Sequence, residues 1–158
     1  MKMRRMDRAM PHMEDMLAVI SKCKVLRLAI HDDPYPYLVP LNFGYAVEGN
    51  NLTFYFHSAK RGRKIDLLLR DPRVCFELDC AHALKEGEIA CKYGFYYESV
   101  IGTGNVRFLE THEEKAGALT AIMRHQAGRD FSFGERETAG IHVMALTVEE
   151  AMGKAHRP

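Results

Sequence analysis

The chain has 158 residues, of which 47% are hydrophobic and 27% are charged, so its composition is that of a globular protein with room for one core. The formal net charge of +1 excludes a global basic field that would draw the chain to nucleic acid or to a membrane surface. No apolar run reaches the length of a membrane span, and the basic N-terminus lacks the apolar core of a signal peptide. We therefore expect one domain over residues 1–158, a cytoplasmic location, and no nucleic-acid or membrane partner.

The first half of the chain predicts a helix followed by three strands. Helical spacing of apolar side chains predicts a helix over residues 11–22, and alternation predicts a strand within residues 24–33. Residues 37–49 predict a second strand, in which Pro40 requires an edge position or a bulge because proline cannot donate to a ladder. Gly49 and two asparagines then turn the chain into a third strand, which is typical of a hairpin.

A short amphipathic helix follows the third strand, with Ile65, Leu68 and Leu69 expected on its buried face. Alternation predicts a further strand over residues 73–79, and the polar residues after it predict a loop or a hairpin tip. Residues 91–110 are long enough for two strands, or for one long strand bent near its glycines.

The last part of the chain predicts a capped helix and a final strand. Thr111 and Glu114 have the spacing of a capping box, which predicts a helix to about His125 with Met123 among its inward residues. Alternation in residues 141–151 predicts the final strand. Because hairpins join consecutive strands, the order of elements predicts an α+β fold with a mostly antiparallel sheet, closed as a barrel and flanked by helices.

The joint between the third strand and the short helix concentrates positive charge, and its four cations are Lys60, Arg61, Arg63 and Lys64. A helix start leaves backbone N–H groups unsatisfied and carries partial positive charge. Ser58 adds a hydroxyl donor, and Gly62 lets the backbone approach a ligand. These groups suit one phosphate monoester, although a solvated cationic turn would have the same sequence.

Other chemistries find less support in the sequence. The joint lacks the spacing of a P-loop, and Arg107 occupies the third glycine position of the only dinucleotide-like motif. The cysteines form no CxxC pair and the eight histidines show no metal-binding spacing, so we predict no metal site. Alternation in the third strand predicts that His57 lies on the face opposite Leu52, Phe54 and Phe56. A histidine at a strand end more often packs or binds than catalyses.

Several segments, in this order, resemble the pyridoxamine 5′-phosphate oxidase-like flavoproteins, and especially their nitroimidazole-resistance group. They are YLVPLNFGY, FYFHSAKRGRKIDLLLRDPRVCFELD, CKYGFYYESVIGTGNVRFLE, HEEKAGALTAIMRH and EEAMGK, and the opening RRMDRAM resembles that group's arginine-rich motif. The resemblance implies an FMN-binding split β-barrel in which the cofactor lies at the interface of a homodimer.

The resemblance also implies roles for individual residues. The phosphate and ribityl end of FMN would contact His57, Ser58, Arg63 and Lys64. The isoalloxazine would lie beside Pro40, Leu41, Asn42 and Phe43. Three residues would lie near the cofactor or the interface, namely Tyr97, Ser99 and Val100, and Lys154 matches the closing GK of the family. His57 is the catalytic candidate.

The function that the resemblance implies is an FMN-dependent oxidoreductase, which reduces small electron-poor compounds such as nitroaromatics. Oxidation of pyridoxine phosphate is not expected, because the substrate-binding residues of that enzyme have no match in this shorter chain. Two alternatives stay open: a flavin- or haem-binding protein without turnover, and a structural dimer with an empty pocket. The substrate and the electron donor are not specified by any motif.

Overall fold

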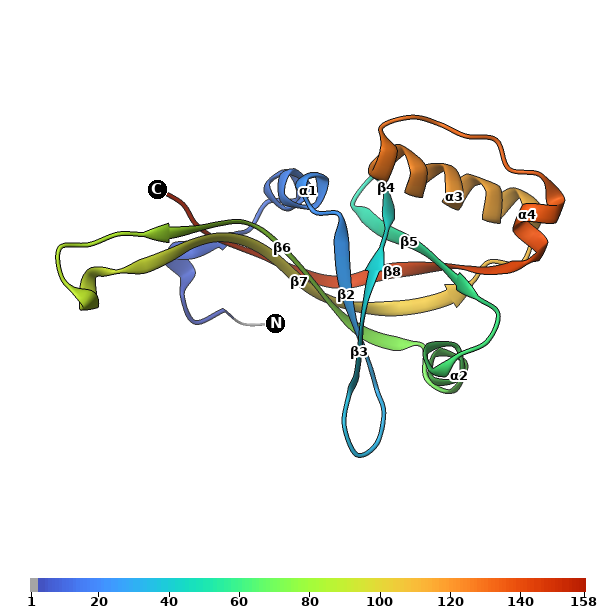
Figure 1. The fold of residues 1–158 in the computed structure, drawn as a ribbon, viewed down its shortest axis with the longest axis horizontal. Coiled ribbons are helices and arrows are strands. Elements are labelled where there is room, and N and C mark those ends of the chain that lie inside the picture. The colour runs from blue at the N-terminus through green and yellow to red at the C-terminus, as the bar shows by residue number, and fades with distance from the viewer. Residues whose placement is uncertain (1–2) are drawn as a thin grey trace.

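One antiparallel sheet runs through residues 3–158, which are the residues that the computed structural model describes (Figure 1). Its strands are β1 (Ala9–Met10), β2 (Val25–Ile30), β3 (Tyr37–Asn42), β4 (Gly44–Glu48), β5 (Asn51–Ala59), β6 (Arg73–Lys85), β7 (Gly94–Phe108) and β8 (Ile141–His156). The helices are η1 (Met6–Arg8), α1 (Met13–Lys22), α2 (Arg63–Arg70), η2 (Ala90–Lys92), α3 (His112–Ala127) and α4 (Glu135–Ala139). The predicted α+β class with a mostly antiparallel sheet is confirmed.

The sheet is open, so the expectation of a closed barrel was wrong. Its strand order is β3-β2-β6-β7-β8-β5-β4, with β1 added to β8, and the two end strands are not hydrogen-bonded to each other. The predicted single strand over residues 37–49 is in fact these two end strands, β3 and β4. Phe43 separates them, because its side chain is fully buried against Phe54, with ring centroids 5.4 Å apart. Pro40 lies in β3 at the sheet edge, as its missing N–H requires.

The alternation predicted for β5 is confirmed. Leu52, Phe54 and Phe56 are buried, whereas His57 lies on the other face and is exposed. Phe54 also packs edge-on against Phe76 of β6, with centroids 5.1 Å apart, so aromatic contacts link the strands across the core. This core holds the end of β5 in place, and with it the candidate site.

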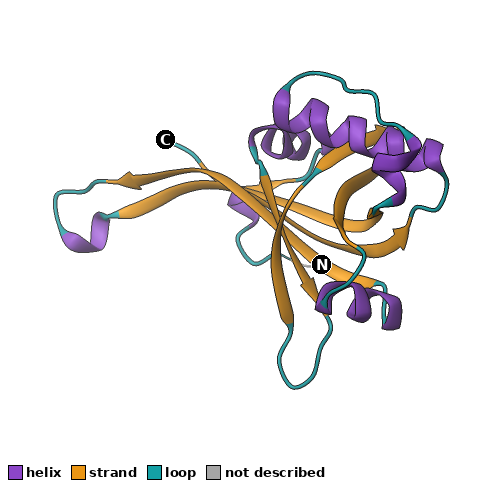
Figure 2. Cartoon of the chain, turned by 45° about the vertical axis from the view of Figure 1, so that its right-hand side comes forward, coloured by secondary structure: helices purple, strands orange, loops and turns teal. Residues whose placement is uncertain are grey.

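Strands β6 and β7 extend past the body of the molecule as a long two-stranded arm with η2 at its tip (Figures 1 and 2). Strand β6 does not end at residue 79, as predicted, because pairing with β7 resumes at Ala83 after a bulge. Strand β7 is one strand, which agrees with the second of the two predicted alternatives. Four large apolar side chains of this arm are exposed: Leu84, Ile89, Tyr93 and Phe95.

The helices follow their sequence signals with two differences. In α2 the buried side chains are Ile65, Leu67 and Leu68, so Leu69, which is 67% exposed, falls outside the buried arc and its predicted burial was wrong. The capping box of α3 is confirmed, because the Thr111 hydroxyl accepts a 3.2 Å hydrogen bond from the Glu114 amide. Helix α4 was not predicted. No helix in the described residues is long and apolar enough to cross a membrane.

Candidate functional site

The start of α2 borders a cavity of about 410 Å³. Its lining comes from the beginning of β3, the end of β5 and the turn into α2, and consists of Tyr37, His57, Ser58, Ala59, Arg61, Gly62, Arg63 and Lys64. All four residues predicted for the phosphate end therefore lie around one cavity. Sequence reasoning missed Tyr37, because nothing in the sequence indicates that β3 begins beside α2.

The backbone at the start of α2 is arranged as an anion site. Gly62 is the N-cap residue and has φ +136° and ψ 161°, a conformation that is essentially restricted to glycine. Its carbonyl accepts hydrogen bonds from the amides of Ile65 and Asp66. No side chain caps the helix, so the amides of the preceding residues, Arg63 and Lys64, have no helical partner. These two N–H groups and the helix dipole favour an anion at this point.

Lys64 is the one half-buried residue among the four cations of this cluster. Burial lowers the pKa of its ammonium group below the usual value for a lysine. No carboxylate in the described part of the chain forms an ion pair with Lys64. A half-buried cation without a counter-charge is costly, and an anionic ligand would offset that cost.

Arg63 differs from its neighbour because it already has a partner. Its Nε donates a 2.8 Å hydrogen bond to Asp32, and the Arg63 guanidinium holds the pKa of that carboxyl below its usual range. Arg70 approaches the same carboxylate at 3.6 Å. Arg63 therefore lines the cavity with a carboxylate partner, whereas Lys64 is the half-buried cation of this cavity that has none in the described residues.

The two residues at the end of β5 contribute differently. The Ser58 residue is only 7% exposed, and its hydroxyl makes no hydrogen bond within the described residues, so it is free to donate to a ligand. The His57 side chain is exposed at the cavity and likewise makes no hydrogen bond or ion pair within the described residues. The uncapped helix, the half-buried lysine and the unbonded hydroxyl together fit a phosphate group.

The four residues predicted beside the isoalloxazine do not line this cavity. Leu41 and Phe43 are core residues, and the Asn42 amide donates to the Lys24 carbonyl at 3.1 Å. These side chains stabilise the fold. A flavin ring beside them would meet the backbone of the edge strand β3, where Pro40 offers a carbonyl but no N–H.

The remaining predicted residues lie far along the sheet from the start of α2, and they are Tyr97, Ser99, Val100 and Lys154. Ser99 and Lys154 are cross-strand partners on β7 and β8, and the Lys154 Nζ lies 5.6 Å from the centroid of the Tyr97 ring. Val100 is fully buried and offers a ligand only its backbone. Ser58 pairs with residue 142 of β8, which is twelve residues (142 to 154) from Lys154, or roughly 40 Å along an extended strand. Within one chain, the residues near Tyr97 and Lys154 are thus separated from the cavity at the start of α2.

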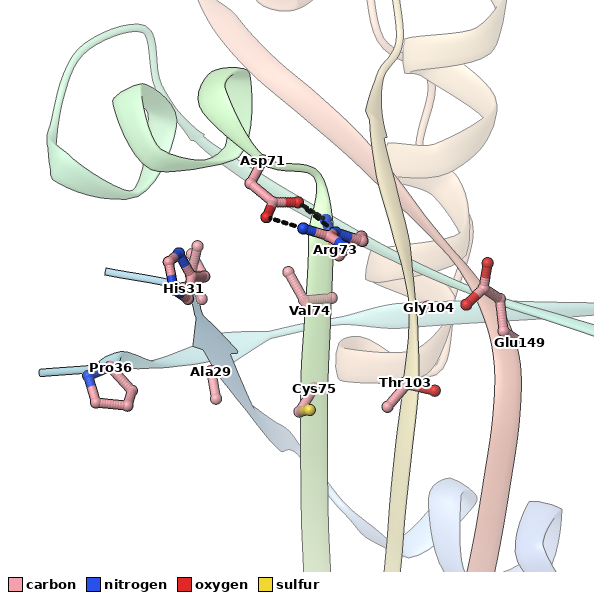
Figure 3. A pocket seen from close by; sticks show the side chains of 11 residues that line it. Ala29, His31, Pro36, Asp71, Arg73, Val74, Cys75, Thr103, Gly104 and Glu149 are labelled. Atoms are coloured by element: carbon pink, nitrogen blue, oxygen red, sulfur yellow. Dashed lines mark hydrogen bonds and ion pairs between the residues drawn. The ribbon is translucent and has the colours of Figure 1, made fainter. Parts of the chain in front are cut away.

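A larger cavity, of about 530 Å³, lies at the other end of α2 (Figure 3). Its lining includes Cys75 and Thr103, which are cross-strand partners on β6 and β7, and the ion pair between Asp71 and Arg73. Hydrogen bonds from Arg73 hold the pKa of Asp71 far below its usual range. Because these two charges balance each other, this cavity lacks the unpaired cation that distinguishes the cavity at the start of α2.

The comparison with known families decides the classification. The sequence profile of the pyridoxamine 5′-phosphate oxidase family matches residues 13–155, which span α1 to β8. The chain belongs to the pyridoxamine 5′-phosphate oxidase family. The resemblance read from the motifs is thereby confirmed.

Solved structures agree with this membership of the pyridoxamine 5′-phosphate oxidase family. A candidate 5-nitroimidazole antibiotic resistance protein from Bacteroides thetaiotaomicron VPI-5482 has a TM-score of 0.82 and 32% identity, covering 93% of this chain and 86% of that chain. An FAD-binding protein from Mesorhizobium loti has a TM-score of 0.64 and 25% identity, covering 95% and 98%. The flavocytochrome Anf3 from Azotobacter vinelandii shares the fold, with a TM-score of 0.80 and 19% identity, covering 99% and 73%. None of the curated proteins compared with the chain matches it.

Proposed function

We propose that the chain binds FMN with its phosphate at the start of α2, and that it is an FMN-dependent oxidoreductase that reduces small electron-poor compounds such as nitroaromatics. The observation that carries the proposal is Lys64, a half-buried cation without a carboxylate partner in the described chain, beside an uncapped helix start. The relatives add support, because one is an FAD-binding protein and another is a candidate nitroimidazole-resistance protein.

The donors around the cavity match a terminal phosphate. A phosphate monoester carries nearly two negative charges near neutral pH and three acceptor oxygens. Lys64 would supply a charge-assisted hydrogen bond, Ser58 a hydroxyl donor, and the first turn of α2 two backbone N–H groups. The exposed guanidinium of Arg61 adds positive charge at the same cavity. This concentration of donors suits the phosphate monoester of FMN better than the pyrophosphate bridge of FAD.

When bound, the flavin would supply the electron or hydride transfer. The residues of the chain would bind it and set its position, with the phosphate fixed at α2 and the edge of β3 beside the ring. Photoreduced, FMN-loaded protein should be reoxidised by a 5-nitroimidazole faster than free reduced FMN, when the two are mixed anaerobically. Equal rates for the protein and for free FMN would contradict the proposed activity. This assay does not depend on knowing the natural electron donor.

We further propose that the active form is a homodimer. The exposed apolar side chains of the arm need a partner surface, and the residues around Tyr97 and Lys154 lie too far from α2 to share a site within one chain. A two-fold dimer could bring the group of one chain to the α2 cavity of the other.

Light scattering at micromolar concentration should therefore report a dimer, with an interface that buries well over ~2,000 Å² in total. A monomer that still holds its flavin would contradict this expectation.

His57→Ala should raise the dissociation constant of FMN but leave turnover at saturating FMN within about tenfold of the wild type. The reason is that His57 borders the phosphate cavity and has no partner in the described chain that would orient it as a proton donor. Steady-state nitroreduction, with flavin occupancy checked by absorbance, measures both quantities. A fall of about 10²–10⁴ in turnover with full occupancy would instead identify His57 as the general acid.

A further inference from the structure

A nearly buried carboxylate contacts one of the cations that line the cavity at the start of α2. It belongs to Asp32, which lies in the connection between β2 and β3, and its side chain is only 8% exposed. A carboxylate close to an anion site repels the anion, so its place here needs a physical reason. The hydrogen bonds of Asp32 indicate what that reason is.

The two oxygens of the Asp32 carboxylate have different partners. Oδ1 accepts a 3.0 Å hydrogen bond from the Asp33 amide and lies 3.6 Å from the guanidinium of Arg70, which also donates to the His31 carbonyl at 3.3 Å. Oδ2 accepts hydrogen bonds from Nε of Arg63, at 2.8 Å, and from Nη2 of the same side chain. Oδ1 therefore fixes the carboxylate to the backbone and to the last residue of α2, and Oδ2 holds the first residue of that helix.

The Arg63 side chain depends on this carboxylate for its orientation. It is 62% exposed, and Asp32 is its only hydrogen-bond partner in the described residues. A long exposed side chain samples many rotamers, so a ligand that binds it must first order it, at a cost in entropy. Two of the five guanidinium N–H groups donate to Oδ2, and the other three stay available on a residue that lines the cavity.

We propose that Asp32 is a positioning residue for the phosphate site, which holds Arg63 in the orientation in which its free N–H groups reach the phosphate. The carboxylate does not touch the ligand and acts only through Arg63. Its repulsion of the phosphate is small, because the two arginines neutralise it, and the ordering of Arg63 before the ligand arrives outweighs that repulsion. This inference rests on the proposed function, since it requires a phosphate at the start of α2.

The charge of Asp32 and its positioning role predict effects of opposite sign. Asp32→Asn removes a negative charge near the site, so electrostatics alone would strengthen FMN binding. Loss of the Oδ2 acceptor should instead weaken FMN binding by about three- to tenfold, which is the cost of ordering one long side chain. Asp33→Asn is the matched control, because Asp33 is exposed, makes no ion pair within the described residues, and carries the same charge one position away. It should not weaken FMN binding.

The affinities for FMN and for riboflavin are measured by quenching of flavin fluorescence at high ionic strength, where exposed charges are screened. The loss in Asp32→Asn should appear for FMN and not for riboflavin, which has no phosphate. In an Arg63→Met background the same substitution should cause no further loss, because Asp32 acts through Arg63. Circular dichroism verifies that each variant is folded.

A measurement on the wild-type protein without flavin tests the contact itself. Nitrogen-15 relaxation should show the Nε–H group of Arg63 ordered and that of Arg61 mobile on the nanosecond timescale. Arg61 is the internal control, because it lines the same cavity, is exposed, and makes no hydrogen bond or ion pair within the described part of the chain.

FMN binding that is unchanged or stronger in Asp32→Asn would overturn the positioning role. An equal loss for FMN and riboflavin, the same loss in the Arg63→Met background, or a mobile Arg63 Nε–H group in the wild type would also overturn it. If the wild type binds FMN and riboflavin equally, the proposed phosphate site fails together with this inference. If the wild type prefers FMN and Asp32→Asn keeps that preference in full, only the positioning role fails.

Discussion

Lys64→Met is expected to weaken FMN binding by about tenfold to more than a hundredfold, whereas Lys60→Met leaves the dissociation constant near that of the wild type. Both substitutions remove one positive charge within the same cluster. Only Lys64 is half-buried and lines the cavity, so only Lys64 would make a charge-assisted hydrogen bond to the phosphate. Quenching of flavin fluorescence on titration into protein without flavin measures the two constants.

The salt dependence provides a control for this comparison. A loss caused by general electrostatics should affect both variants alike and disappear as ionic strength rises, because exposed charges are screened. A loss caused by a specific contact should persist in Lys64→Met alone. Equal dissociation constants for the two variants would count against phosphate binding at α2.

Gly62→Ala is expected to destabilise the protein by about 1–3 kcal/mol, because an alanine would have to adopt a backbone conformation that is essentially restricted to glycine. An added Cβ meets no atom within 4 Å, so the cost comes from backbone strain and not from a clash. Relaxation of that strain would move the N–H groups at the start of α2, and FMN binding should weaken as well. Urea denaturation of the protein without flavin, at one protein concentration, measures the change in the free energy of unfolding.

Gly117→Ala is the matched control for this substitution. Gly117 lies within α3, is exposed, and has open space around an added Cβ. The same chemical change should therefore stabilise the protein by about 0.5–1 kcal/mol, since alanine favours a helix more than glycine does. A Gly62→Ala variant that is as stable as the wild type and binds FMN with unchanged affinity would show that the positive φ of residue 62 has no role in the site.

The sequence predicted most of the fold, because local patterns determine most of its elements. Alternation placed Phe54 in the core and His57 outside it, and the capping box marked the start of α3 at Thr111. The errors arose where distant contacts decide the structure. The separation of β3 from β4 depends on Phe43 packing against Phe54. The length of the arm depends on pairing of residues 83–85 of β6 with residues 94–96 of β7, which resumes after a bulge.

For the candidate site as well, the sequence predicted what neighbouring residues determine and missed what distant contacts determine. The cationic strand-to-helix joint was visible in the sequence, since His57, Ser58, Arg63 and Lys64 are neighbours in the chain. The difference between Arg63 and Lys64 was not visible, because Asp32, which balances Arg63, is distant in sequence. The sequence also could not show that Lys154 and Tyr97 lie far from this joint within one chain, as that distance depends on the register of β8.

The most direct measurement of the central claim is a comparison of FMN with riboflavin, which lacks only the phosphate. The account predicts that FMN binds to the wild-type protein at least about a hundredfold more tightly than riboflavin, and that Lys64→Met removes most of this difference. An absorbance spectrum of the loaded protein should show flavin rather than haem. Equal affinities for FMN and riboflavin would contradict the assignment of the phosphate to the start of α2.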